Sequence, residues 1–553
     1  MMPKLTLASP TSTGLRGRGW LLAAALIALA VLAPLASLAW WALDADLSHW
    51  SHLAAYVLPQ ALANTALLLL GVGVLVTLLG TGAAWLVAAY DFPSRKILVW
   101  ALLLPLAVPT YIIAFAYLDL LHPIGPVQSA IRAVLGYDSP RQFRLPDLRS
   151  LGGAVFVLGF VLYPYVYLST RVMFMTQAAS LIEAARTLGA GRMGVFFRVA
   201  LPLARPAIAV GVSLALLETL NDIGASEFLG VQTLTVSVYT TWITRSDLAG
   251  AAQIALTMLA FVLALVLLER RGRKRQRYAN TQRMRPMQPQ RLHGTAALAA
   301  CVLGWIPVLL GFVAPALYLM AETYKRLHLV GGVSGQLLSS LGNTLVVAAS
   351  ATVLTVVCGL AVAWAARNLG AGAGPARACA RVASLGYAVP GTVLAIGLLA
   401  PFAWIDQAAG KWLGLPGMLL MGSIGALVCA YTIRFLAIST GGIEAGLARI
   451  PPSLEHASRL LGENASGTLR RVHLPLLRPA LAAAALLVFV DTMKELPATL
   501  LLRPMNFDTL ATWLYAEAAR GTYEEGAVAA LAIVLAGLAP VILLARSNLK
   551  MGH

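Results

Sequence analysis

The sequence predicts an all-α membrane protein with about twelve transmembrane helices, arranged as two parallel repeats of six helices each. Its 553 residues are 59% hydrophobic and only 12% charged, whereas soluble domains carry about 25% charged residues. Many apolar runs reach roughly 20 residues, the length at which a helix crosses a bilayer. A polar, basic segment over Glu183–Pro206 also returns as Glu455–Pro479, which indicates two related halves.

The repeat has a nearly constant spacing along the chain. Gly462 follows Gly189 by 273 positions (462 − 189), and Trp364 follows Trp85 by 279 (364 − 85). The repeat therefore covers whole halves, with small insertions or deletions between these markers. We expect a first repeat, a basic linker and a second repeat at residues 1–268, 269–291 and 292–553.

The first half contains six apolar runs that we interpret as membrane spans. Pro105 and Pro109 lie inside the third run and should kink it, because proline removes backbone hydrogen bonds. The segment His122–Ser150 between the third and fourth runs has mixed charge and is expected outside the membrane. The six expected spans are Leu21–Leu43, Leu62–Ala89, Ile97–Leu121, Leu151–Thr170, Ala207–Phe228 and Ala251–Leu268.

The second half repeats this plan after the linker Glu269–Arg291, which is dense in Arg, Lys, Gln and Pro. Such a linker has no apolar period and is expected in the cytoplasm, in contact with anionic lipid headgroups. The expected spans of this half are Ala296–Met320, Leu341–Ala366, Val382–Trp404, Met418–Ile438, Ala480–Leu502 and Ala527–Leu544.

The charge distribution predicts the orientation and argues against nucleic acid as a partner. The formal net charge is +18, but the Lys and Arg residues lie in short loops between apolar runs, as the positive-inside bias predicts. Both chain ends and both repeated segments are therefore expected in the cytoplasm. The four cysteines have no CxxC spacing, which argues against a zinc or redox site.

The repeated segments carry a spaced motif. The first contains Glu183-Ala184-Ala185, then Gly189, then Leu201-Pro202; the second contains His456-Ala457-Ser458, Gly462 and Leu474-Pro475. This pattern resembles the EAA loop of binding-protein-dependent ABC importer permeases. The second copy departs from the family at His456, where Glu is usual, although Glu455 lies one residue earlier.

The local sequence fits a short helix in each loop. Leu181–Leu188 is rich in alanine, Gly189 can end a helix there, and Pro202 and Pro206 are expected to break the chain before the next span. The resemblance implies a coupling helix that docks on a cytoplasmic ATPase, in a fold like that of type I ABC importers. It assigns this role to Glu183, Ala184, Ala185, Gly189, Pro202, Glu455, His456, Ala457, Gly462 and Pro475.

The chain is expected to be a translocation subunit and not an enzyme. It contains no GxxxxGK[ST] phosphate-binding loop, so ATP hydrolysis is expected on a separate ATPase, in two copies for two loops. We expect no cofactor on this chain and assign no metal ligand. No HExxH or GxSxG spacing occurs either.

Each span that follows a repeated loop carries carboxylates. Glu218 and Asp222 are four residues apart, as are Asp491 and Glu495, and Lys494 lies beside the second pair. A spacing of four is expected to place each pair on one helical face. Carboxylates at membrane depth are costly, so they line the translocation pathway, form a buried network between helices, or lie at the outer end of the span in contact with water.

Three further stretches narrow the resemblance to ferric-iron importer permeases with two fused halves. They are Leu104–Leu121, Tyr387–Leu399 and Leu486–Thr512. The resemblance implies a bacterial inner-membrane permease that imports ferric iron from a periplasmic binding protein. Thiamine or a polyamine is the alternative substrate, and a secondary transporter with parallel repeats is the alternative class.

Overall fold

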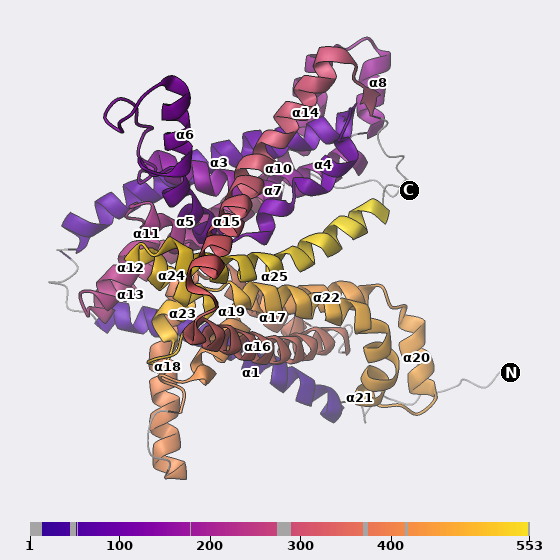
Figure 1. Cartoon of the computed structure of the whole chain (residues 1–553). Coiled ribbons are helices and arrows are strands. Elements are labelled where there is room, and N and C mark those ends of the chain that lie inside the picture. The colour runs from indigo at the N-terminus through magenta and orange to yellow at the C-terminus, as the bar shows by residue number, and fades with distance from the viewer. Residues whose placement is uncertain are drawn as a thin grey trace. The chain divides into compact units, whose positions relative to one another are not determined.

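The structure is a computed structural model that describes residues 14–44, 51, 53–176, 179–273, 289–368, 374–414 and 419–550 (Figure 1). Within these residues 11 helices are long and apolar enough to cross a membrane, or up to 12 when one bent pair is counted as a span. The expected multi-span helical fold is confirmed. Most of the predicted linker, residues 274–288, lies outside the described residues.

The chain forms two compact units that do not coincide with the two sequence halves. One unit, here called the 41–343 unit, contains Trp41–Asn343 and Phe507–His553. The other, here called the 344–506 unit, contains Met1–Trp40 and Thr344–Asn506. The first helix therefore packs with the second half of the sequence, and the last helix packs with the first half.

The 41–343 unit is built on α3, α7 and α10, which pack on one another. Glycines allow these helices to approach closely: a Cβ on Gly80 would lie 2.8 Å from the carbonyl oxygen of Tyr163. The helices and strands of this unit are η1 (Leu53–Val57), α3 (Leu58–Ala89), β1 (Tyr90–Asp91), α4 (Arg95–Ala101), η2 (Leu104–Ala107), α5 (Thr110–Leu120), α6 (Pro126–Leu135), α7 (Leu151–Thr176), α8 (Ala179–Thr187), α9 (Arg192–Val195), η3 (Phe196–Ala200), α10 (Leu201–Asn221), α11 (Gly224–Phe228), α12 (Leu234–Ile243), α13 (Leu248–Arg273), β2 (Gln290–Arg291), α14 (Gly294–Val308), η4 (Leu309–Val313), α15 (Ala314–Val330), α24 (Leu510–Arg520) and α25 (Tyr523–Lys550).

The 344–506 unit repeats this plan around α16, α19 and α22. A buried apolar cluster lies where their ends meet the second loop, and it includes Trp364, Leu447 and Leu477. Its elements are α1 (Gly14–Asp44), α16 (Gly335–Asn368), α17 (Gly374–Ala383), η6 (Ser384–Ala388), α18 (Gly391–Leu413), α19 (Ile424–Ala448), α20 (Pro452–Leu460), α21 (Ala465–Thr468), η7 (Leu469–His473), α22 (Leu474–Met493) and α23 (Pro497–Leu502). In Figure 1, α20 and α21 lie together at one end of α22.

The third predicted span is broken, as its prolines suggested. Arg95–Ala107 and Thr110–Leu120 form a bent pair with an angle of 92°. Pro105 lies in a 3₁₀ turn, and Pro109 precedes the first residue of α5. The second half has a 3₁₀ turn and Pro390 at the corresponding place, before α18.

Several predicted span limits are wrong because the helices run on through polar residues. The span predicted to start at Ala207 begins at Arg192 and ends at Asn221, and the span predicted to start at Ala480 runs from Ala465 to Met493. In both, a π-helical turn joins the short helix of the loop to the long helix. Pro202 and Pro206 therefore lie within α10 and do not break the chain before it.

Candidate functional site

The first repeated loop consists of a short helix closed by a left-handed glycine. The helix α8 ends at Thr187, and Gly189 has φ of +82°. The amides of Gly189 and Ala190 donate to the carbonyls of Arg186 and Ala185, both at 3.0 Å, and so cap the helix end. The predicted helix and its glycine stop are confirmed, although the helix begins two residues earlier than predicted.

The second loop repeats this geometry at a shift of 273 residues. The helix α20 covers Pro452–Leu460, and Gly462 has φ of +87°. The amides of Gly462 and Glu463 donate to the carbonyls of Arg459 and Ser458 at 3.0 and 3.1 Å. Each loop then continues through a four-residue helix and a five-residue π-helical turn into its long helix.

The two loops expose corresponding positions of their motifs. Glu183 and Ala184 are exposed on α8, and His456 and Ala457 are exposed on α20. Glu455, however, is buried at 7% exposure, and its register partner in the first loop is Ile182. The glutamate before His456 is therefore an interior residue and does not replace the missing surface glutamate. Pro202 and Pro475 are the second residues of α10 and α22, directly after the π-helical turns that precede these helices.

The paired carboxylates do not share one helical face, contrary to the prediction. The helix α10 ends at Asn221, so Asp222 follows its last turn while Glu218 lies within it. In the same way α22 ends at Met493, between Asp491 and Glu495. The spacing of four is broken by the end of the helix in both halves.

The second carboxylate of each pair is buried and holds the chain after this break. Oδ1 of Asp222 accepts from the amide of Ala225 at 2.7 Å, and its Oδ2 accepts from the hydroxyl of Thr110. Oε1 of Glu495 accepts from the amide of Ala498 at 3.1 Å. Asp222 and Glu495 thus stabilise the starts of α11 and α23 at equivalent places.

The two halves use different partners for these buried carboxylates. Glu495 Oε2 lies 3.1 Å from Nε of Arg434, and both side chains are buried. The position of Thr110 is taken by Gly391, and a Cβ there would lie 2.5 Å from an Nη atom of Arg434. Glycine therefore makes room for the arginine. Sequence reasoning missed this arginine, although a lone Arg in the apolar run of α19 was a visible signal.

The first carboxylate of each pair is half-buried. Asp491 Oδ1 lies 2.8 Å from Nζ of Lys494, three residues further on. Glu218 is half-buried at the corresponding position of α10. In the described residues no three His, Cys, Asp or Glu side chains come together as a metal-binding group.

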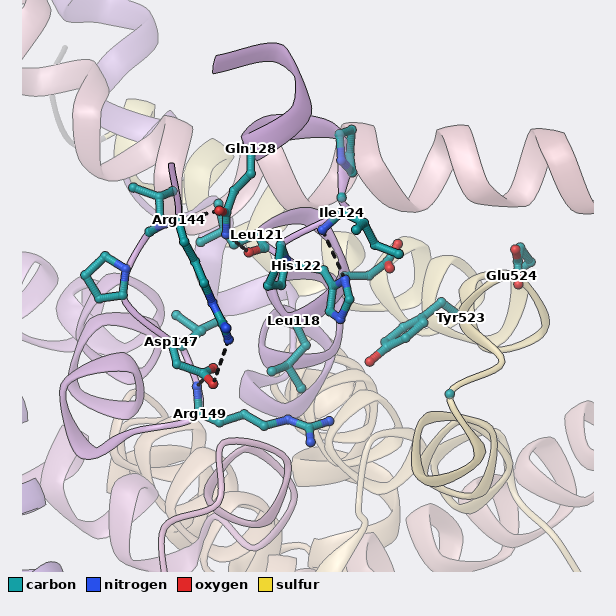
Figure 2. A pocket seen from close by; sticks show the side chains of 18 residues that line it. Leu118, Leu121, His122, Ile124, Gln128, Arg144, Asp147, Arg149, Tyr523 and Glu524 are labelled. Carbon is teal, nitrogen blue, oxygen red and sulfur yellow. Dashed lines mark hydrogen bonds and ion pairs between the residues drawn. The ribbon is translucent and has the colours of Figure 1, made fainter. Parts of the chain in front are cut away.

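A polar pocket of about 580 Å³ lies beside the start of α7, and Figure 2 shows the side chains that line it. It is formed between the segment after α5 and the start of α25, and its lining includes Asp119, His122, Arg149 and Glu524. Arg144 points toward Asp147 in Figure 2, with Nη2 at 3.8 Å from Oδ2. The segment His122–Ser150, predicted outside the membrane, supplies most of the polar groups.

A smaller cavity of about 240 Å³ shares Arg149 and Tyr523 with this pocket. Here the hydroxyl of Tyr515 donates to Oε2 of Glu227, and the ring of Tyr515 stacks on Phe228 at a centroid distance of 5.5 Å. Burial raises the pKa of Glu227 above its ordinary value, and the bond from Tyr515 lowers that pKa in part.

A sequence model of the binding-protein-dependent transport system inner membrane component family matches residues 77–278 and 355–549. The chain belongs to this family of ABC importer permeases. Each matched segment contains one of the repeated loops, so the permease carries the family domain twice in one chain. The resemblance deduced from the motif is confirmed.

Similar permeases differ in the substrate that their names state. The Fe(3+)-transport system permease protein FbpB 2 of Haemophilus influenzae is 26% identical over 500 residues, which cover 89% of this chain and 90% of that protein. The molybdenum transport system permease protein ModB of Escherichia coli is 32% identical over 34% of this chain and 80% of its own. The putative 2-aminoethylphosphonate transport system permease protein PhnU of Salmonella paratyphi A is 30% identical over 35% of this chain and 67% of its own.

One solved structure among those similar to the permease is a bacterial alginate ABC transporter in complex with an alginate-bound periplasmic protein. It has a TM-score of 0.37 and 16% identity, and it covers 44% of this chain and 91% of that chain.

Proposed function

We propose that this permease is the translocation subunit of an ATP-driven importer whose substrate is ferric iron delivered by a periplasmic binding protein. The observation that carries the importer role is the pair of loops with the same geometry, one in each family domain. Support for ferric iron comes from the FbpB 2 relative, because that alignment spans nearly all of both chains.

The loops are proposed to face the cytoplasm and to dock on two copies of a separate ATPase. A short helix held between two long helices can lie in a groove on a partner. After its glycine turn each loop enters a continuous long helix, Arg192–Asn221 or Ala465–Met493. The helices α8 and α20 are separated from it by that turn but pack on its π-helical turn, η3 or η7. Movement of α8 or α20 is therefore transmitted to α10 or α22 through this packing, and alternating access follows from closure of the ATPase pair.

Asp222 and Glu495 are proposed to act on this movement from the other end of the same helices. They hold the short helices that follow α10 and α22, so the helix ends and the next segments move together. Glu218, Asp491 and Lys494 are half-buried beside these turns and are the better candidates for lining the pathway. Carboxylate oxygens suit a hard cation such as Fe3+.

An oxyanion is the second candidate substrate. The molybdenum and phosphonate permease relatives favour it, and so do Arg144 and Arg149 in the polar pocket, because arginine binds oxyanions in a bidentate manner. Those relatives cover about a third of this chain, which is why ferric iron is preferred.

Uptake measurements separate the candidates. In cells that lack the permease, we expect radioactive ferric iron uptake to fall and to return when the gene is restored, with molybdate uptake unchanged. The opposite pattern would replace iron by an oxyanion. Purification of the tagged permease with an ATPase tests the class, since a secondary transporter would bring no ATPase with it.

A further inference from the structure

The second loop is attached to its unit by a polar cluster of the buried Glu455 and His473 and the partly buried Arg367. Nε of Arg367 lies 2.6 Å from Oε1 of Glu455, and its Nη atoms donate to the carbonyls of Leu447 and Ile450 at 3.2 and 2.9 Å. Nε2 of His473 lies 3.3 Å from the same Oε1 atom. The cluster joins the end of α16, the middle of α20 and the last residue of η7, directly before α22.

The first loop has only apolar residues at the equivalent positions. Glu455 corresponds to Ile182 and His473 to Ala200, both at the shift of 273, and Arg367 corresponds to Ala88 at the shift of 279. Ala88, Ile182 and Ala200 are all fully buried. The same loop geometry is therefore held by charges in one half and by apolar packing in the other.

As a consequence, α8 and α20 expose different residues. The surface glutamate of α8, Glu183, corresponds to His456 on α20, and both side chains are exposed. The only glutamate on α20 is Glu455, whose carboxylate is turned inward and bonded to Arg367. An ATPase that docks on both loops meets a carboxylate on α8 and an imidazole on α20.

We propose that Glu455 is a positioning residue, which fixes α20 through Arg367 and His473, and that the acidic contact with the ATPase is made by Glu183 alone. The proposal rests on the proposed docking of an ATPase. Its physical basis is that the guanidinium of Arg367, only 21% exposed, is unfavourable there when its anion is removed. Loss of Glu455 alone should displace α20, whereas removal of the whole cluster should not, because the first loop is stable without it.

The test transfers the apolar residues of the first loop to the second. Five tagged permeases are purified with the ATPase that accompanies them: the wild type, Glu455→Ile, Glu455→Gln, Glu183→Gln, and the triple variant Arg367→Ala, Glu455→Ile, His473→Ala. We measure the retained ATPase, the substrate transported per ATP hydrolysed, and the rate of trypsin cleavage after the exposed Arg459 on α20.

The single variant Glu455→Ile should lose retained ATPase roughly tenfold or more and should be cleaved faster at Arg459. The triple variant should return both values to within about twofold of the wild type, because it copies the uncharged packing of the first loop. Glu183→Gln should be cleaved at the wild-type rate and yet transport less substrate per ATP. Glu455→Gln, which keeps the side-chain shape, should give an intermediate loss.

The outcomes that contradict the proposal are distinct from those that contradict the proposed function. A triple variant that is cleaved at the wild-type rate but still loses the ATPase would show that the carboxylate of Glu455 itself contacts the partner. If the triple variant misfolds, wild-type cleavage and ATPase retention in Glu455→Gln would refute the proposal as well. A wild-type permease that retains no ATPase would refute the docking function, and the cleavage rates alone would then decide whether Glu455 positions α20.

Discussion

At the residue scale, Glu227 is a carboxylate whose ionisation is coupled to one hydroxyl. Burial raises its pKa and the bond from Tyr515 lowers it in part. Because the folded state holds this proton more tightly than the unfolded state, the free energy of unfolding is highest in acid and falls as the pH rises through the folded-state pKa. The contribution of Glu227 to the stability of the permease should thus decline as the pH rises above the ordinary pKa of a glutamate carboxyl.

Tyr515→Phe should make this decline larger. The variant removes the donor to Glu227, so the folded-state pKa rises further, and each pKa unit corresponds to about 1.4 kcal/mol. The melting temperature of the solubilised permease across this pH range measures the effect. The double variant Glu227→Gln, Tyr515→Phe serves as control and should have a flatter profile than Tyr515→Phe; an equally steep profile would assign the titration to another group.

The single-residue level is also where sequence reasoning was least reliable. The motif placed Glu183, Gly189 and Gly462 correctly on the loops, because their spacing is tied to helix length. It also assigned the buried Glu455 to the docking surface. This error arose because neighbouring positions on a helix point about 100° apart, and the sequence does not state which face is buried. The partner Arg434 of Glu495 was missed because it lies 61 residues away (495 − 434).

At the scale of elements, the glycine that ends each loop helix should control the coupling of ATP hydrolysis to transport without supporting the rest of the fold. Gly189 and Gly462 have positive φ, and a Cβ at either position would meet no atom of the described residues within 4 Å. A β-branched residue at this φ costs about 1–2 kcal/mol or more in strain. Gly189→Val and Gly462→Val should therefore change the end of α8 or α20 and lower the substrate transported per ATP, while the permease still accumulates in the membrane.

A nearby glycine provides the matched control for this experiment. Gly191 has φ of −65° and equally open surroundings among the described residues, so Gly191→Val should transport normally. Gly189→Asn should retain most of the activity because asparagine tolerates the left-handed region. Equal defects in the Gly189 and Gly191 variants would point to side-chain bulk and not to backbone conformation.

The helix crossings near the repeated loops depend on a second type of glycine. A Cβ on Gly80 would lie 2.6 Å from Cβ of Val166, and a Cβ on Gly359, its equivalent in α16, would lie 2.4 Å from Oγ of Ser439. Gly80→Ala should therefore destabilise the permease by about 1–3 kcal/mol. Gly82→Ala, two residues further along the same helix, meets no atom within 4 Å in the part of the chain that the structure describes and should be neutral or stabilising. Melting temperatures of the two variants test this contrast.

The elements themselves were largely predictable, and their limits were not. Apolar runs of membrane length locate most of the spans because the bilayer sets that length. The segments before Ala207 and Ala480 are polar, and hydropathy assigned them to loops, although they continue the helix through π-helical turns. The bend after Pro105 was predicted because the loss of backbone hydrogen bonds at proline is a local effect.

At the scale of the whole molecule, the two compact units each require pieces from both sequence halves. Hydropathy identifies the spans but does not state which spans pack together, so this exchange was not predicted. The 344–506 unit uses α1, and the 41–343 unit uses α14, α15 and α25. The exchange makes the halves structurally dependent on each other.

A divided chain tests this dependence. Two polypeptides that end at Arg273 and begin at Pro289 should each be degraded when expressed alone, because each unit then lacks packed helices. Coexpression should restore protease-resistant material and uptake, since the units can assemble from separate chains. If either fragment alone resists proteolysis as well as the intact permease, the exchanged helices are dispensable for stability.

The exchanged first helix has a consequence for biosynthesis. A Cβ on Gly397 in α18 would lie 2.4 Å from the carbonyl oxygen of Pro34 in α1, so these two helices touch. The ribosome must add 363 further residues (397 − 34) after Pro34 before this neighbour exists. At about 5–20 residues per second, α1 waits roughly 20–70 s in the bilayer beside lipid or an insertion factor before it reaches its final site.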